Sequence, residues 1–408
     1  MRKSFIIKLL HVSVFMLFVL LYFGFEEQEM VATMMYHVDQ TANSAPLRNL
    51  FLLASVVFML PCCLLGKWPR IHFARFLLVM YIYVVVVSVF LGPVDNLGPV
   101  SYVVLLCATM LPLLVYNFVY NAAMKLNPRA IEYMVGGGLV VLALFYAITF
   151  RTVLVSYVLH AEFRDGTVYV FMMFLPFVMT LSNRKVRNVG ILLIVIALAS
   201  SLKRGGMVTA VISLIAYYLV GQRVSEQKTP GLVKLLAFFA VIILIIAGVV
   251  YINYTSDGMI FERFSTMDSD GGSGRDVVYA ETWGLISDSD GLQLLIGHGW
   301  NHVQADSPLK VSAHNDYLEA LYDLGLPGFL FMLLLLLLVF GTAHSLVRQK
   351  SEFAPAYVAS FMIFFINTMI SHIFLYPLNM TALTLFWGYV AGRVKRAELE
   401  QSPQPLQP

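Results

Sequence analysis

The sequence predicts an all-α protein, a polytopic bundle of about twelve membrane-spanning helices with a small helical cap on the outer side. Hydrophobic residues make up 59% of the 408 positions and charged residues only 12%, whereas soluble domains carry about 25% charged residues. Apolar runs long enough to cross a bilayer recur along the whole chain. One long polar stretch interrupts them near residues 253–324, and this stretch is the place for the cap.

Each predicted span is an apolar run that approaches the about 17–25 residues a transmembrane helix needs. The runs lie near 5–25, 48–66, 71–91, 97–120, 132–150, 167–182, 187–202, 206–221, 232–252, 325–346, 354–376 and 378–392. The first run follows Arg2 and Lys3 and ends near Phe25 without a small-residue cleavage site. An uncleaved first span is therefore favoured over a signal peptide.

The lysines and arginines are distributed unevenly between the two sides of this bundle. Nineteen of the 27 fall in segments on the side of the N-terminus, and such segments are cytoplasmic by the positive-inside rule. We therefore predict that both termini are cytoplasmic and that the long loop faces outward. The predicted regions are spans one to nine over 1–252, the outward loop over 253–324, spans ten to twelve over 325–393, and a disordered cytoplasmic tail over 394–408.

The outward loop is strongly acidic and is predicted to be folded. It holds twelve of the 24 acidic residues and three basic ones, which are Arg263, Arg275 and Lys310. Apolar residues at helical spacing predict one helix over 275–288 and another over 316–323. In the second helix three carboxylates share one face, namely Asp316, Glu319 and Asp323. These patterns are typical of a cap of short helices.

Two adjacent cations, Lys203 and Arg204, separate two apolar runs on the outward side, against the positive-inside trend. Charge at membrane depth is costly and marks functional positions. Guanidinium groups bind phosphate oxygens in bidentate fashion, and the flanking Gly205 and Gly206 would let a phosphate approach the backbone. The alternative interpretation is an ordinary turn whose two cations extend to the membrane surface.

Arg275 follows the glycine-containing turn 272–274 and stands at the start of a predicted helix. A cation in this place can hold an anion together with the helix N-terminus. The alternative interpretation is a salt bridge to Asp276 or Glu281 within a solvated cap. For Arg263, a surface ion pair is favoured over a binding role.

The cluster His314-Asn315-Asp316 lies where the polar loop enters a leucine-rich span. Histidine exchanges a proton near neutral pH, and a neighbouring carboxylate or amide can orient its ring. His314 is therefore a candidate general base, with Asn315 or Asp316 as its orienting partner. A structural role is the alternative, since a lone histidine by itself is a weak functional signal.

Metal and redox chemistry have little support in the sequence. The Asp-x-Asp motifs at 268–270 and 288–290 lie in Gly/Ser turns, where aspartate commonly caps the backbone, so no metal site is predicted. The three cysteines, Cys62, Cys63 and Cys107, lie in apolar runs and predict neither a disulfide nor a metal site.

The order of the motifs over residues 200–340 resembles that of a known family. It runs through Ser201-x-x-Arg204-Gly205, Gly274-Arg275 in a long outward loop, Gly297-His298-Gly299, and His314-Asn315-x-x-Leu318-Glu319 followed by Gly325-x-x-Gly328. This pattern is similar to that of the O-antigen ligase/O-antigen polymerase superfamily of bacterial integral-membrane glycosyltransferases. The spans before residue 200 resemble that superfamily only in being apolar and of membrane-spanning length.

The resemblance implies a fold of the lipid-carrier glycosyltransferase (GT-C-like) type in the bacterial inner membrane, with a periplasmic active site. It implies a glycan on undecaprenyl diphosphate as the donor, and lipid A-core or a growing glycan as the acceptor. The implied reaction is inverting and metal-independent and uses no cofactor, and no nucleic acid is a partner. Arg204, Arg275 and His314 would be catalytic, with both arginines and Lys203 binding the diphosphate. The supporting residues would be Asn315, Asp316, Arg263 and Glu319.

Three functions remain open from the sequence. An O-antigen ligase that uses lipid A-core is slightly favoured over a repeat-unit polymerase, because the cap is compact and the span count fits. Both enzymes share the motifs above. A transporter of the same lipid-linked glycan is the rival from another class. Transporters place polar and helix-breaking residues near the middle of the membrane in two related halves, whereas here the candidates gather on one side and in the second half.

Overall fold

The computed structural model describes part of the chain, and every regular element in that part is an α-helix. The described residues are 56–57, 59–61, 63–64, 72–91, 109–134, 136–137, 168–200, 204–225, 250, 253–254, 271–371, 373–374 and 377–401. The spans predicted near 5–25, 132–150 and 232–252 lie largely outside these residues, as do Lys203 and Arg263. No strand occurs among the described residues, which confirms the all-α class for them.

The chain divides into two compact units. The first comprises Met1–Val89, Pro93–Val158 and Tyr376–Pro408, and the second comprises Phe90–Gly92 and Leu159–Leu375. The predicted outward loop and all three residues predicted to be catalytic therefore belong to the second unit.

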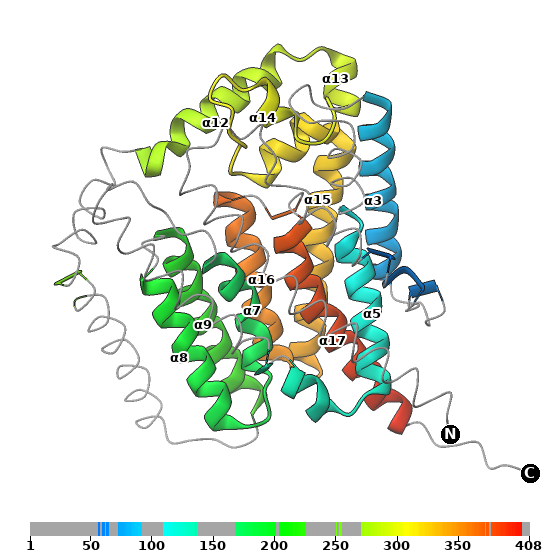
Figure 1. Ribbon diagram of the computed structural model, residues 1–408, viewed down its shortest axis with the longest axis vertical. Helices are drawn as coiled ribbons and strands as arrows, with labels where there is room; N and C mark the ends of the chain where they lie inside the picture. The colour runs from blue at the N-terminus through cyan, green and yellow to red at the C-terminus, as the bar shows by residue number, and fades with distance from the viewer. Residues whose placement is uncertain are drawn as a thin grey trace, which may run out of the picture. The chain divides into compact units, whose positions relative to one another are not determined.

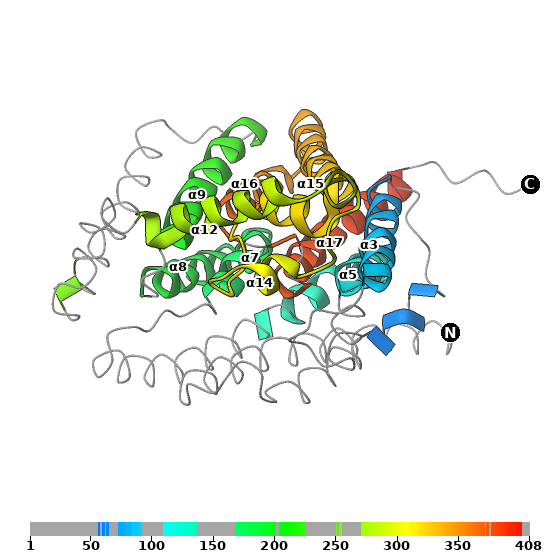
Figure 2. The ribbon, with the colours of Figure 1, turned by 90° about the horizontal axis from the view of Figure 1, so that it is seen from above.

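In the first unit, α5 (Leu111–Lys125) and α17 (Pro377–Gln401) lie side by side, as Figures 1 and 2 show, and most of α3 (His72–Leu91) belongs to the same unit. A Cβ atom on Gly388 of α17 would lie only 2.5 Å from the carbonyl oxygen of Tyr116 on α5. Small residues allow such close approach between helix backbones in membranes.

Helix α17 continues to Gln401, so residues 394–401 are helical. The boundary of the tail predicted to be disordered from residue 394 is thereby corrected. Two ion pairs, each with an N–O distance of 2.8 Å, stabilise the last turns: Lys395–Glu398 and Arg396–Glu400. Pairs at this spacing support a helix whose composition is polar.

The membrane part of the second unit contains five helices among the described residues. They are α7 (Val168–Met179), α8 (Arg184–Ser200), α9 (Arg204–Val224), α15 (Asp316–Arg348) and α16 (Ala354–Ile370). Helices α9 and α16 are antiparallel, because Gly205 at the start of α9 meets Ile370 at the end of α16, and Gly221 meets Pro355 at the other end.

Helix α15 is broken near its start. Its 33 residues would span about 50 Å at 1.5 Å per residue, whereas the hydrocarbon core of a bilayer is about 30 Å thick. Gly325 interrupts the helix with φ 64° and ψ −167°, and Pro327 follows. The polar residues before Gly325 therefore form a separate short helix, and the leucine-rich residues after it form the span.

Among the described residues, three helices are long and apolar enough to cross a membrane, at Phe73–Leu91, Gly205–Val224 and Asp316–Arg348. They support a membrane protein. The total of about twelve spans stays a prediction, since many of the predicted runs lie outside the described residues.

The region predicted to form the cap is helical over 275–288 and 316–323, as predicted. It contains α12 (Gly271–Asp288), α13 (Gly291–Ile296) and α14 (His302–Asp306), which lie at the end of the second unit where α15 begins (Figure 1). Its small core consists of Ile286, Val303, Ala313 and Tyr322. Burial of these four side chains fixes α12 and the turn before α15 to each other.

Candidate active site

The Gly-His-Gly motif attaches the cap to the first turns of α15. The backbone N–H groups of His298 and Gly299 donate to the carbonyl oxygens of Tyr322 (3.1 Å) and Asp323 (2.8 Å). The His298 ring stacks on the Tyr322 ring at a centroid distance of 3.9 Å. Gly297 has φ 85°, and a Cβ atom there would lie 2.3 Å from the carbonyl oxygen of Asp323. This motif is therefore a docking element.

All three predicted carboxylates on α15 bind backbone groups, and Asp323 and Asp316 each bind two N–H groups. Asp323 is fully buried and accepts hydrogen bonds from the N–H groups of Asn301 (2.7 Å) and Val303 (2.9 Å). Asp316, 1% exposed, accepts bonds of 3.0–3.1 Å from the backbone after α16, at Ile373 and Phe374. Both side chains hold neighbouring segments in place, because a buried carboxylate needs such donors.

His314 has a backbone conformation that is rare for a residue with a side chain. Its φ is 50°, in the left-handed region, where a non-glycine residue costs of order 1–3 kcal/mol and persists only when its surroundings enforce it. Two neighbours enforce it here. The Tyr279 hydroxyl donates to the His314 carbonyl oxygen at 3.3 Å, and the preceding Ala313 is fully buried.

Asn315 begins α15 as its N-cap. Its side-chain oxygen accepts from the N–H groups of Tyr317 (3.0 Å) and Leu318 (3.3 Å), which satisfies donors that the helix leaves free. Its side-chain nitrogen donates to the Met369 carbonyl oxygen near the end of α16 at 3.3 Å. The turn that carries His314 is thereby joined to both α15 and α16.

Glu319 lies under this turn and is 5% exposed. Its carboxyl group forms a hydrogen bond with the backbone of Ala313, directly before His314. The other carboxyl oxygen, Oε2, has no hydrogen-bond partner among the described residues. Glu319 therefore stabilises the His314 turn through one hydrogen bond to its backbone.

The loop arginine lies on the face of α12 that is turned toward this turn. Arg275 forms a side-chain hydrogen bond with Tyr169 of α7 and acts electrostatically on Tyr279, one helical turn further along α12. Burial raises the pKa of the Tyr279 phenol, and Arg275 together with a hydrogen bond from Asn315 offsets part of this rise. The phenol is therefore protonated at neutral pH and acts as a donor.

Arg204 is the first residue of α9, and its side chain lies outside the described atoms. A Cβ atom on the adjacent Gly205 would lie 3.7 Å from the Tyr169 hydroxyl and 2.9 Å from the Ile370 side chain. Because Tyr169 also contacts Arg275, the structure brings the backbone at Arg204, the Arg275 side chain and the His314 turn to one end of the second unit. Lys203 and Arg263 lie outside the described residues.

Comparison with known proteins assigns this region to a family. Residues 189–333 match the family model described as O-antigen ligase. The chain therefore carries a domain of the O-antigen ligase/polymerase superfamily. No curated protein matches the chain. The matched O-antigen ligase domain begins in α8 and ends in α15, so it contains Arg204, Arg275 and His314. The match supports an activity of the O-antigen ligase/polymerase kind in general.

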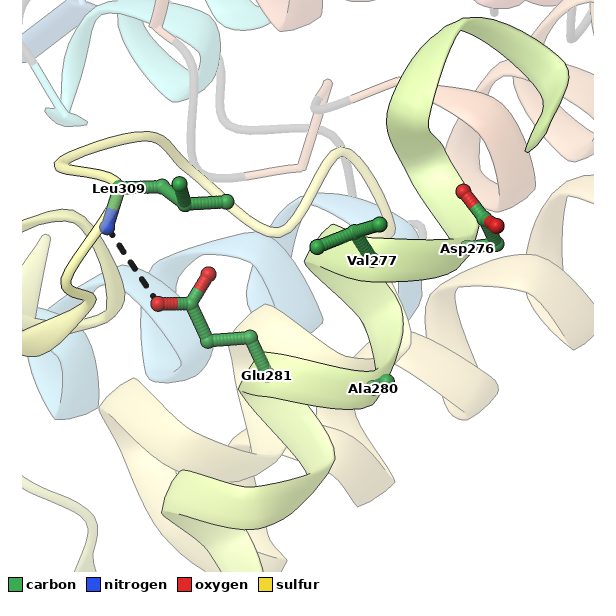
Figure 3. Close-up of a pocket in the computed structure, with 5 residues that line it drawn as sticks. All are labelled: Asp276, Val277, Ala280, Glu281 and Leu309. Carbon is green, nitrogen blue, oxygen red and sulfur yellow. Dashed lines mark hydrogen bonds between the residues drawn. The ribbon is translucent and has the colours of Figure 1, made fainter. Parts of the chain in front are cut away.

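The matched domain also has a groove of about 540 Å³ on α12, on the helix face that points away from Arg275 and Tyr279 (Figure 3). It is lined by Asp276, Val277, Ala280, Glu281 and Leu309. The Leu309 N–H donates to Glu281 Oε1 at 3.3 Å. Among the ion pairs between described residues, none joins Arg275 to Asp276 or Glu281, so the salt-bridge interpretation of Arg275 has no support there.

Three residues that contact the candidate site escaped prediction: Tyr169, Tyr279 and Met369. Tyr279 stands four residues after Arg275, a spacing that puts both on one helix face, so the sequence did contain a signal for it. The other two come from distant helices, and Met369 contributes only its carbonyl oxygen. No side-chain pattern indicates such a contact.

Asp290 belonged to a motif considered in the sequence analysis, and the structure gives it a structural role. It was weighed as half of a metal-binding Asp-x-Asp motif, and the structure shows it as the N-cap of α13. Its side chain accepts from the Gln293 N–H at 2.8 Å, and the Gln293 side chain accepts from the Asp290 N–H at 2.8 Å. This reciprocal pair is a capping box.

Proposed function

We propose that the protein is an O-antigen ligase that transfers a glycan from undecaprenyl diphosphate to lipid A-core at the periplasmic face of the inner membrane. The observation that carries this proposal is the convergence of the α9 start, Arg275 and the strained His314 turn, connected through Tyr169 and Tyr279. The superfamily domain at residues 189–333 supports it.

In the proposed reaction the arginines bind the diphosphate of the donor. Negative charge on the diphosphate grows as the bond between its oxygen and the anomeric carbon breaks. Preorganised cations at that position stabilise the transition state more than the ground state. Arg275 and Arg204 are assigned this role, with Lys203 as a further cation, and guanidinium groups supply the charge without a metal ion.

His314 is assigned the role of general base. Its imidazole takes the proton of the acceptor hydroxyl, whose oxygen then attacks the anomeric carbon from the side opposite the diphosphate. The new glycosidic bond forms as the old bond breaks, undecaprenyl diphosphate leaves with the bonding electron pair, and the anomeric centre is inverted. Asn315 and Glu319 support the turn that carries the base.

The groove on α12 is a candidate site for part of the glycan, on the helix face that lies opposite Arg275 and Tyr279. Its volume of about 540 Å³ lies within the range of about 300–1,000 Å³ common for ligand sites. Carboxylates such as Asp276 and Glu281 accept hydrogen bonds from sugar hydroxyls, and Val277 and Leu309 offer apolar surface to a sugar ring (Figure 3).

The test is the lipopolysaccharide profile of a deletion strain complemented with wild type, His314→Ala or the matched control His344→Ala. His344 is an exposed histidine near the other end of α15. A ligase predicts free core without glycan in the deletion strain, restored by wild type and by the control but not by His314→Ala. Membrane levels of each variant are compared by immunoblot.

Two other outcomes would replace this assignment. Core that carries a single repeat unit in the deletion strain would identify a repeat-unit polymerase of the same superfamily. A transporter would be indicated if His314→Ala restored the profile fully and lipid-linked glycan accumulated on the cytoplasmic side of the deletion strain. The convergence of the site residues at one end of the second unit favours an enzyme.

A further inference from the structure

One hydroxyl group joins three segments of the site. The Tyr279 phenol donates to the Met369 carbonyl oxygen at 2.9 Å and, less closely, to the His314 carbonyl oxygen at 3.3 Å. It also accepts a hydrogen bond from the Asn315 side chain, which itself reaches the Met369 carbonyl at 3.3 Å. Helix α12, the turn before α15 and the end of α16 therefore meet at this oxygen.

The contact matters because of what lies on either side of it. Arg275 is four residues away on the same helix, about 6 Å along the axis. His314 has the left-handed φ of 50°, which neighbouring contacts must maintain. A shift of the His314 carbonyl would rotate the peptide unit after His314 and change the direction of its side chain. The Tyr279 hydroxyl is therefore placed to fix the imidazole relative to the guanidinium.

We propose that Tyr279 is a positioning residue that sets the geometry between Arg275 and His314 through its hydrogen bonds to the backbone of the His314 turn and of α16. The inference rests on the proposed function and adds to it a residue outside the motifs that define the site. Tyr279 acts through its two neighbours and takes no part in bond making, since its hydroxyl is engaged with backbone oxygens.

The test is Tyr279→Phe in the full-length protein, reconstituted in lipid nanodiscs. The substitution removes one oxygen atom and leaves the ring. We expect kcat for transfer from undecaprenyl-diphosphate-linked glycan to purified lipid A-core to fall about tenfold or more, because small displacements of catalytic groups are costly. KM for the donor is expected to stay within about twofold, since Arg275 still binds the diphosphate.

The matched control is Tyr317→Phe. Tyr317 lies in the first turn of α15, and its hydroxyl contacts Thr368 Oγ1 of α16 at 3.4 Å. The control loses the same atom, also from a contact with α16, but its hydroxyl does not bind the His314 carbonyl, so its kcat should remain near that of wild type. Melting curves of all proteins are recorded, and activities are compared well below each midpoint so that only folded protein is assayed.

Three outcomes for Tyr279→Phe are decisive. A loss of kcat in Tyr279→Phe, with donor KM, melting midpoint and pH profile unchanged, supports a positioning role. A kcat equal to that of the Tyr317→Phe control overturns it, and so does loss of the alkaline limb of the pH profile, which would make the phenol itself an acid. The variant His314→Ala distinguishes failure of the proposed function from failure of this inference. Full activity of His314→Ala refutes the proposed function. An inactive His314→Ala together with a fully active Tyr279→Phe refutes only the positioning role of Tyr279.

Discussion

Substitution of Gly297 by alanine tests how the cap is attached to α15, the helix that follows the candidate site. The glycine has φ 85°, and a Cβ atom would lie 2.3 Å from the Asp323 carbonyl oxygen and 2.6 Å from the Gly325 nitrogen. At φ 85° and ψ −173° the backbone is in a region populated essentially by glycine alone, where another residue costs of order 1–3 kcal/mol. The added Cβ atom would also push the Gly-His-Gly segment away from α15 and disrupt the hydrogen bonds from His298 and Gly299 to that helix. Each of these bonds contributes about 1 kcal/mol.

The expected loss is therefore about 3–5 kcal/mol in the free energy of local opening, since the strain and the two hydrogen bonds act on one segment. This corresponds to about a hundredfold or larger increase in amide exchange. Hydrogen–deuterium exchange with mass spectrometry measures it on peptides that cover residues 297–303. Global melting is a poor substitute, because a multi-helix membrane protein need not unfold in one step.

Two further glycines on the cap separate the effect of backbone strain from the effect of lost contacts with α15. Gly274 has φ 76° and open space around its Cβ position, and Gly284 has open space and ordinary helical φ. Gly274→Ala should therefore show only local strain, and Gly284→Ala should leave exchange in residues 297–303 at the wild-type rate. Exchange in Gly297→Ala no faster than in Gly274→Ala would refute the docking role of the Gly-His-Gly motif.

Two other substitutions test the site and the bundle. Glu319→Ala removes the hydrogen-bond partner of the buried Ala313 backbone. An unsatisfied buried group costs about 1–3 kcal/mol, so glycan transfer should fall in this variant. Glu319→Gln keeps an acceptor and should retain most activity, and equal activity of the two variants would contradict this role. Gly388→Val inserts side-chain atoms where the Cβ position is 2.5 Å from the Tyr116 carbonyl oxygen. The melting midpoint in detergent should therefore drop below that of the control Gly341→Val, whose Cβ position has open space around it. Identical midpoints would refute close packing of α5 and α17.

Much of the architecture followed from residue order alone. Apolar runs predicted the helices because a bilayer requires them to be long and hydrophobic, and α9, α15 and α16 lie where runs were predicted. The cap helix at 275–288 followed from apolar spacing. Local chemistry also predicted that a helix begins directly after the His-Asn pair, and Asn315 is its cap.

The ends of elements were predicted less well. The disordered tail was placed from residue 394, but α17 continues to Gln401. The deciding interactions are side-chain pairs within the helix and a hydrogen bond of 2.7 Å from Arg396 to the Leu126 carbonyl. A polar segment can be helical or disordered by composition, and a contact with a distant helix selects between the two.

The sequence by itself determined the helical class, the membrane character and the chemical identity of the candidate cations and base. Only the tertiary structure decided their surroundings. It turned the three acids of α15 inward, gave Asp316 and Asp323 backbone partners, and placed Tyr279 between His314 and Met369. These contacts join residues that are 20 to 90 positions apart and often involve carbonyl or N–H groups. Every residue carries those groups, so residue identity predicts local periodicity but not which backbone atoms will meet.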